Sequence, residues 1–197
     1  MLSLQGLKKT FNPGSINAKI ALNELSLELK PGDFVCIIGG NGAGKSTLLN
    51  SIAGAFSVDR GKIVIDGQNV ENQPEYARAS FIGRVFQDPM MGTAASMTIE
   101  ENLAMAVKRG SRRCLRRAIS SQDRVFFSEQ LSLLGLGLEN RLSTRVGLLS
   151  GGQRQALTLL MATLVPPKLL LLDEHIASLD PGTAQIVLDL TQKIVSK

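Results

Sequence analysis

Apolar positions in the first part of the chain recur with the spacing of strands. A short β piece at residues 2–4 is followed by residues 20–29, in which leucines alternate with polar side chains over positions 25–29. A period of two is typical of a strand with one buried face. Lys-Pro-Gly-Asp at residues 30–33 predicts a turn. The apolar run at residues 33–38 then predicts a buried strand.

The rest of the chain alternates strand-like and helix-like segments. Residues 61–68 predict a strand that ends in Asp-Gly, and residues 81–86 predict a core strand. Residues 151–164 have a helical pattern, and residues 168–173 form a very apolar strand. A closing helix at residues 181–195 has proline near its N-terminus. This alternation is typical of an α/β domain.

A helical insert interrupts this pattern at residues 90–148. It includes an apolar helical pattern at residues 98–107, where Thr98 and Glu101 have the spacing of a capping box. Residues 128–138 continue with helical periodicity and end in Gly-Leu-Gly. We therefore expect an α/β core on both sides of a helical part.

A phosphate-binding loop follows the first apolar run. Residues 39–47 read Gly-Gly-Asn-Gly-Ala-Gly-Lys-Ser-Thr and match G-x-x-x-x-G-K-[ST]. The glycines let several N–H groups point at one anion, Lys45 adds positive charge for the β- and γ-phosphates, and the Ser46 hydroxyl can ligate Mg²⁺. A helix starting at about Lys45 directs its positive dipole end at the phosphates. The residues expected to contact the nucleotide here are Gly39, Asn41, Gly42, Ala43, Gly44, Lys45, Ser46 and Thr47.

Two further motifs follow in order: Leu-Ser-Gly-Gly-Gln at residues 149–153, and four leucines followed by Asp173 and Glu174. With the phosphate loop they make the chain similar to the ATP-binding-cassette (ABC) ATPases, over residues 2–197. The resemblance implies an α/β P-loop NTPase fold with an antiparallel β subdomain and an inserted helical subdomain. It divides the single domain into residues 1–89, 90–148 and 149–197.

The two carboxylates supply what the phosphate loop lacks. Four preceding leucines predict a buried strand, whose C-terminal end lies beside the phosphate loop in this fold class. Asp173 is then expected to hold Mg²⁺, directly or through water, and Glu174 to orient and deprotonate the attacking water. The resemblance adds Gln87, which corresponds to a glutamine that contacts Mg²⁺ and this water. The expected catalytic residues are Glu174, Gln87 and Lys45, and the expected metal ligands are Ser46, Gln87 and Asp173.

The resemblance also implies an ATP site shared between two chains. Two cassettes pair head to tail, so that the signature residues of one complete the ATP site of the other. These residues are Ser150, Gly151, Gly152 and Gln153, with Asp180 at the same interface. Phe11 stands where the family carries an aromatic residue that stacks on adenine; the alternative is a buried packing residue.

The chain departs from the family after its catalytic glutamate. His175 and Ile176 stand where Pro-Thr is common, and His175 is not the family's switch histidine, which follows the next core strand. The sequence ends at Lys197, just after a predicted helix. We therefore expect a C-terminally truncated cassette that binds ATP and hydrolyses it poorly.

Composition bounds the compartment and the partners. The chain has 197 residues, 44% of them hydrophobic, with no run long enough to cross a bilayer and no secretory leader. We therefore expect a cytosolic protein, whose two cysteines suit a reducing compartment, with Cys36 in the buried strand.

Part of the net charge of +5 comes from a basic cluster. Its members are Lys108, Arg109, Arg112, Arg113, Arg116 and Arg117. A solvated helical face is favoured over a site for nucleic acid or anionic lipid, because no aromatic residues interleave with it.

The leading functional hypothesis is the ATPase subunit of a membrane transporter, at the cytoplasmic face of the membrane. Its expected partners are a second ABC ATPase subunit, an integral-membrane permease and a solute-binding protein. The resemblance is greatest to a bacterial importer group connected with amino acids. One rival is a soluble ABC ATPase acting on ribosomes or nucleic acid. Another is a P-loop kinase or GTPase, which leaves residues 149–153 unexplained.

Overall fold

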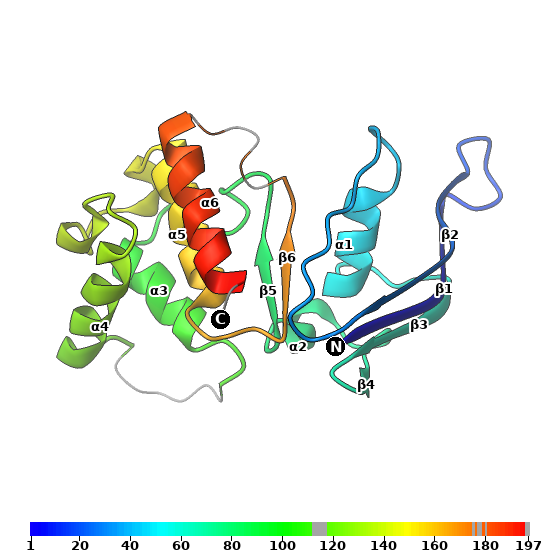
Figure 1. Ribbon diagram of the computed structural model, residues 1–197, viewed down its shortest axis with the longest axis horizontal. Coiled ribbons are helices and arrows are strands. Elements are labelled where there is room, and N and C mark those ends of the chain that lie inside the picture. The colour runs from blue at the N-terminus through cyan, green and yellow to red at the C-terminus, as the bar shows by residue number, and fades with distance from the viewer. Residues whose placement is uncertain (112–117, 175, 177–178, 180, 196–197) are drawn as a thin grey trace. The chain divides into compact units, whose positions relative to one another are not determined.

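The computed structural model describes the 197 residues except 112–117, 175, 177–178, 180 and 196–197 (Figure 1). Expectations for Arg112, Arg113, Arg116, Arg117, Asp180 and His175 therefore lie outside the described residues. The chain forms two compact units, Met1–Ile82 and Gly83–Lys197. No helix in the described part is both long enough and apolar enough to span a membrane.

Unit 1 is built on a four-stranded antiparallel sheet in the order β2-β1-β3-β4. Its strands are β1 (Leu2–Phe11), β2 (Lys19–Leu29), β3 (Arg60–Ile65) and β4 (Gln68–Asn69). Leu2 pairs with Leu29 on one side and with Ile65 on the other. The turn between β3 and β4 is made by Asp66 and Gly67, both at positive φ. The predicted antiparallel β subdomain is confirmed.

The phosphate-loop helix begins where the sequence predicts it. Helix α1 spans Lys45–Ala53, and its C-cap Gly54 has φ 86°. A short helix, α2 (Glu75–Arg78), follows β4. Arg78 is only 1% exposed, although it is charged. Its guanidinium donates hydrogen bonds to the carbonyl oxygens of Ser51 (2.7 Å) and Ile52 (2.9 Å) in the last turn of α1.

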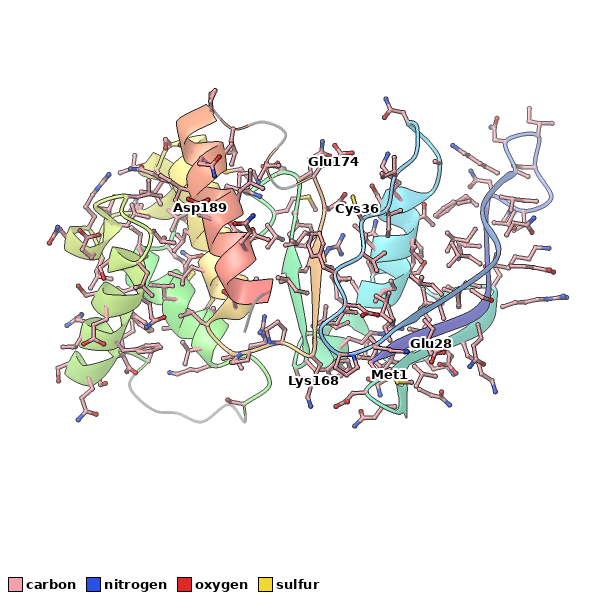
Figure 2. The ribbon with its side chains drawn as sticks, in the orientation of Figure 1. Met1, Glu28, Cys36, Lys168, Glu174 and Asp189 are labelled. Atoms are coloured by element: carbon pink, nitrogen blue, oxygen red, sulfur yellow. The ribbon has the colours of Figure 1, made fainter. Side chains whose placement is uncertain are left out.

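The predicted buried strand at residues 33–38 is wrong. The segment pairs with no strand among the described residues, and Phe34 and Ile38 are 65% and 91% exposed. Cys36 is likewise exposed rather than buried, and Figure 2 shows it on this segment. A strand needs a neighbour to satisfy its N–H and C=O groups. In unit 1 the described strands pair only with one another, in the order β2-β1-β3-β4, and residues 33–38 add no strand to them.

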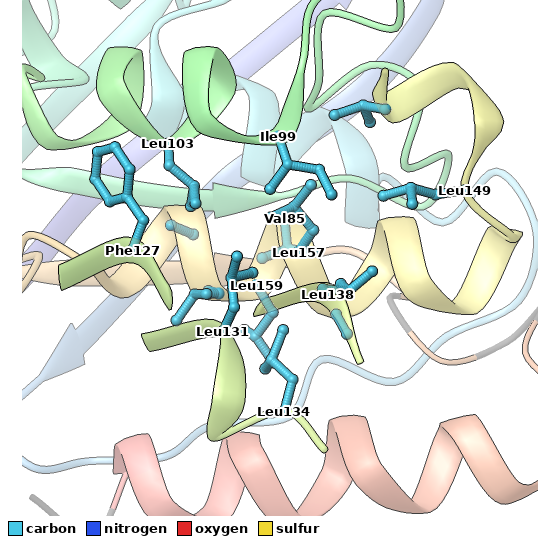
Figure 3. Close-up of a cluster of buried hydrophobic side chains, with 14 of the residues drawn as sticks. Val85, Ile99, Leu103, Phe127, Leu131, Leu134, Leu138, Leu149, Leu157 and Leu159 are labelled. Atoms are coloured by element: carbon cyan, nitrogen blue, oxygen red, sulfur yellow. The ribbon is translucent and has the colours of Figure 1, made fainter. Parts of the chain in front are cut away.

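Unit 2 holds a two-stranded sheet and the remaining helices. Strands β5 (Ile82–Val85) and β6 (Leu169–Leu172) run parallel, and the backbone N–H of Asp173 donates to the carbonyl oxygen of Val85 at 3.1 Å. The helices are α3 (Ile99–Val107), α4 (Ser121–Ser132), α5 (Gly151–Thr163) and α6 (Pro181–Val195), with short 3-10 turns η1 (Leu138–Asn140) and η2 (Val146–Leu148). One hydrophobic cluster joins them (Figure 3). Its fully buried members include Val85, Ile99, Leu103, Leu131, Leu138, Leu157 and Leu159.

Side-chain caps start three of these helices. The capping box predicted from Thr98 and Glu101 is confirmed at α3. The helix predicted at residues 128–138 is misplaced, because α4 begins at a second box made by Ser120 and Asp123. Leu134 and Leu138 are buried although they follow the helix, so apolar periodicity continued past its end.

The expectation of a freely solvated basic face fails at Arg109. Its guanidinium is partly buried, and it donates to the carbonyl oxygens of Ala162 (3.3 Å) and Val165 (2.7 Å) at the C-terminal end of α5. Burial lowers the pKa of Arg109 from its ordinary value. A cation here complements the negative end of the helix dipole. Arg109 is therefore part of the internal structure of unit 2.

Candidate functional site

The first turn of α1 is left open to an anion. Its N-cap is Gly44, at φ 93°, and no side chain caps the helix, whereas α3, α4 and α5 each have a capping box. The first N–H groups of a helix need acceptors, and a phosphate can supply them. Gly44 has to be glycine, since its φ is positive and a Cβ would collide with the carbonyl oxygen of Ala21. The Ser46 side chain at this helix start is exposed.

Lys45 lies across its own loop. Its Nζ donates to the carbonyl oxygens of Gly39 (2.7 Å) and Gly40 (3.3 Å). These neutral acceptors hold the ammonium beside the loop's N–H groups. Phosphate oxygens would be stronger acceptors for this ammonium, because they add the attraction between opposite charges. The loop therefore fits a polyphosphate.

A second lysine near the loop was missed in the sequence. Lys19 opens β2 opposite Phe11, and its Nζ lies 3.2 Å from where a Cβ on Gly42 would stand. The loop motif does not include residue 19, so this second cation is found from the folded position of Lys19 beside Gly42. It adds to the positive charge around the phosphate loop.

Phe11 ends β1 as a partly exposed side chain. Its ring packs edge-to-face on Phe56, with centroids 5.5 Å apart and planes at 82°. The Lys9 ammonium lies 5.7 Å from the Phe11 centroid. These contacts fix the ring, so a stacking surface for a base is compatible with the geometry.

The predicted catalytic pair meets at one edge of the sheet of unit 2. Gln87 follows β5 and Glu174 follows β6, and the amide Nε2 of Gln87 donates to Oε2 of Glu174 at 3.0 Å. Figure 2 shows Glu174 at the end of β6. Its backbone has φ 43°, an unusual value for a residue other than glycine. The structure thus joins Gln87 to Glu174, and Asp173 directly precedes Glu174 at the end of β6.

The signature residues form the start of α5. The Ser150 hydroxyl accepts the backbone N–H of Gln153, whose Oε1 accepts the N–H of Ser150. Ser150 keeps its own hydroxyl proton free to donate, because a hydroxyl can donate once and accept twice. Gly151 has open space around it. A Cβ on Gly152 would lie 2.9 Å from Cβ of Thr183 in α6, so Gly152 allows these two helices to approach.

The candidate magnesium ligands suit a cation that takes the rest of its coordination from nucleotide phosphates and waters. Among the described residues, no three or more His, Cys, Asp or Glu side chains gather into a metal site. Mg²⁺ is usually bound by one or two protein oxygens together with phosphates and waters. Ser46 and Asp173 are donors of this kind, and both are at least partly exposed.

Comparison with known proteins identifies the family. The family model described as ABC transporter matches residues 22–177. The chain is 43% identical to the tyrosine transport ATP-binding protein of Clostridioides difficile (strain R20291), covering 99% of this chain and 77% of that protein. It is 33% identical to the methionine import ATP-binding protein MetN of Legionella pneumophila (strain Lens), covering 98% of this chain but only 53% of that protein.

A solved structure gives the same answer. A dimeric, post-hydrolysis state of the ATP-binding cassette MJ0796 bound to ADP and Pi aligns with a TM-score of 0.82 at 28% identity, covering 99% of this chain and 83% of that one. The chain belongs to the ABC transporter family, as its ATP-binding and ATP-hydrolysing part. The P-loop NTPase fold and the ATPase activity expected from the sequence are confirmed.

Proposed function

We propose that this cassette powers a bacterial importer of an amino acid or a similar small solute. The importer assignment is supported by the relative named for tyrosine transport, which matches 99% of this chain, and by the relative named for methionine import. The observation that carries the chemistry is the 3.0 Å hydrogen bond between Gln87 and Glu174. It joins the proposed water-orienting residue to the proposed base.

Each residue has a defined part in hydrolysis. Lys45 and the N–H groups at the start of α1 bind and orient the phosphates. The Glu174 carboxylate accepts a proton from water, and the Gln87 amide holds one of its oxygens, leaving the other to face the water. Phe11 stacks on the adenine. Ser46, Asp173 and Gln87 are the residues proposed to hold Mg²⁺, which would supply positive charge to offset that of the phosphates.

The complete machine has more than one chain. A second cassette would contribute Ser150, Gly151, Gly152 and Gln153, with Asp180, to each ATP site. The helical part at residues 90–148 would receive a membrane permease, so the cassette would sit at the inner face of the membrane. A solute-binding protein would complete the importer. A soluble role on ribosomes or nucleic acid is not favoured, since the relatives described above are named for transport and import. In addition, Arg109 of the basic cluster binds the carbonyl oxygens of Ala162 and Val165.

The test of the catalytic assignment is Glu174→Gln, which keeps the side-chain shape and removes the base. ATP binding and ATP-dependent dimerisation should persist, while hydrolysis falls by about 100-fold or more. Glu28→Gln is the matched control, because Glu28 is exposed on β2. Failure of the Glu174→Gln variant to dimerise with ATP would overturn the proposed sharing of the ATP site between two cassettes.

The transport role is tested separately. The natural protein, captured by affinity from solubilised membranes, should bring down a polytopic permease that mass spectrometry identifies. A solute-binding protein in the same eluate would indicate the cargo. Ribosomal or DNA-repair proteins without a permease would overturn the importer assignment.

A further inference from the structure

Helix α5 carries three side chains that contact the segment after β5. Gln155 is 1% exposed, and its Nε2 donates to the carbonyl oxygen of Phe86 at 3.3 Å. Arg154 donates from Nη1 to the sulfur of Met90. Thr158 approaches Gly92 so closely that a Cβ there would lie 2.6 Å from its methyl carbon. Residues 86–92 thus pack against α5 and are hydrogen-bonded to it.

The same helix also binds residues 146–149, which lead into Ser150 and are called the signature loop below. Arg154 donates through Nη2 to the carbonyl oxygens of Gly147 and Leu149, both at 3.1 Å, and through Nε to that of Val146 at 3.3 Å. Because these residues directly precede Ser150, a displacement of the signature loop is transmitted to α5. One helix therefore contacts both the signature loop and residues 86–92.

The contact at Phe86 lies next to the catalytic pair. The Phe86 carbonyl belongs to the peptide bond that joins Phe86 to Gln87, so a hydrogen bond to this oxygen fixes the plane from which Gln87 emerges. The Gln87 side chain then reaches Glu174 at 3.0 Å. Only the Gln155 carboxamide and one peptide unit separate α5 from the Gln87–Glu174 pair.

The Gln155 carboxamide is a poor choice for stability alone. Its Oε1 is buried and has no hydrogen-bond partner among the described residues. A buried polar atom without a partner destabilises the folded state. Methionine has nearly the same length and no such atom, so it would fill this position without that cost. The Nε2 bond to Phe86 is what the carboxamide provides and methionine does not.

We propose that Gln155 is a positioning residue, which couples the signature loop to the catalytic pair by holding the Phe86–Gln87 peptide. The proposal rests on the function proposed above, in which Gln87 and Glu174 serve hydrolysis. The role proposed for Gln155 requires no contact with the nucleotide or the water. It acts through the orientation of Gln87, so its loss should lower the turnover rate and leave ATP binding intact.

The test is Gln155→Met in the natural full-length protein, with Gln122→Met as control, because Gln122 is exposed on α4. Hydrogen exchange over residues 86–92 should become faster, and kcat for ATP hydrolysis should fall about tenfold. The KM for ATP should stay within about twofold, and the melting temperature should be unchanged or higher. The control should match the wild type in all four measurements.

Two results would overturn the coupling. One is unchanged exchange over residues 86–92 together with unchanged kcat. The other is a lowered melting temperature with kcat and KM altered in parallel, as for a residue needed only for folding. If Gln155→Met does not fold, Gln155→Leu takes its place. It removes the same donor to the Phe86 carbonyl oxygen, so exchange over residues 86–92 should become faster and kcat should fall. Wild-type exchange and kcat in that variant would equally overturn the coupling.

The activities of the two variants distinguish a wrong catalytic assignment from a wrong coupling. If Glu174→Gln hydrolyses ATP like the wild type, the catalytic assignment itself is wrong. If Glu174→Gln is inactive while Gln155→Met retains wild-type kcat and exchange, only the coupling is wrong.

Discussion

The Ser150 hydroxyl accepts the backbone N–H of Gln153 at 3.2 Å, and the Gln153 side chain accepts the backbone N–H of Ser150 at 3.2 Å. The signature motif is therefore a capping box for its own helix. The residues proposed to reach a second cassette's nucleotide also determine where α5 begins. Ser150 therefore stabilises its own helix and is also proposed to complete the ATP site of the other cassette.

Replacing Ser150 with alanine should destabilise the protein by about 1 kcal/mol, the usual cost of losing an N-cap side chain. Ser150→Thr keeps a hydroxyl acceptor and should lose less. Urea denaturation followed by circular dichroism measures both. Equal midpoints for Ser150→Ala and the wild type would contradict the capping role.

The two lysines near the phosphate loop should differ in their contributions. Lys45→Ala should weaken ATP binding about tenfold or more, because a charge-assisted hydrogen bond to phosphate is lost. Lys19→Ala should weaken it less, with an effect that shrinks at high salt, as expected for an exposed charge. Titration with a fluorescent ATP analogue at two salt concentrations measures this, with Lys62→Ala on β3 as control. Unchanged affinity in Lys45→Ala would refute the assignment of the loop.

Arg78 should be essential for unit 1. Arg78→Met would leave the carbonyl oxygens of Ser51 and Ile52 without their donor, and we expect a loss of about 3 kcal/mol. Arg78→Lys should recover only part of this, because an ammonium lacks the forked donors of a guanidinium. Thermal unfolding tests the order wild type, Arg78→Lys, Arg78→Met. Full stability in Arg78→Lys would show that charge alone suffices.

Asp59 should make stability depend on acidity. The backbone N–H of Thr10 donates to its carboxylate at 2.6 Å, and this bond, aided by Lys9, lowers the pKa of Asp59 below its ordinary value. The ionised form is therefore favoured by folding. Its contribution is present above about pH 4 and is lost as the pH falls through the lowered pKa.

Melting temperatures measured from pH 6 to pH 3 should show this loss in the wild type. Asp59→Asn should be less stable at pH 6 and less sensitive to acid, whereas Glu28→Gln should follow the wild type. An equally steep acid dependence in Asp59→Asn would assign the effect to other carboxylates.

Features set by neighbouring residues were predictable from the sequence. The start of α1 at Lys45 and the box between Thr98 and Glu101 depend on a few consecutive positions, and both are observed. The box of Ser120 and Asp123 carries an equally local signal. The helix was instead predicted at residues 128–138 from the apolar repeat, which continues past the end of α4 to Leu138.

Features set by distant neighbours were not predictable. The run at residues 33–38 has the composition of a strand, but pairing requires another strand at its side. Arg78 and Arg109 look like surface residues, yet each binds a carbonyl oxygen in the last turn of a helix. Gln87 and Glu174 were each singled out, while the bond between them depends on β5 and β6 ending at the same edge.

The two ends of helix α1 differ in their hydrogen-bond partners. The carbonyl oxygens of Ser51 and Ile52 in its last turn accept hydrogen bonds from Arg78, whereas no side chain caps its first turn. Nucleotide binding and the stability of this helix are therefore linked, so ATP should slow amide exchange most in its first turn. Binding of ATP to a single cassette would then stabilise the first turn of α1 before a second subunit binds.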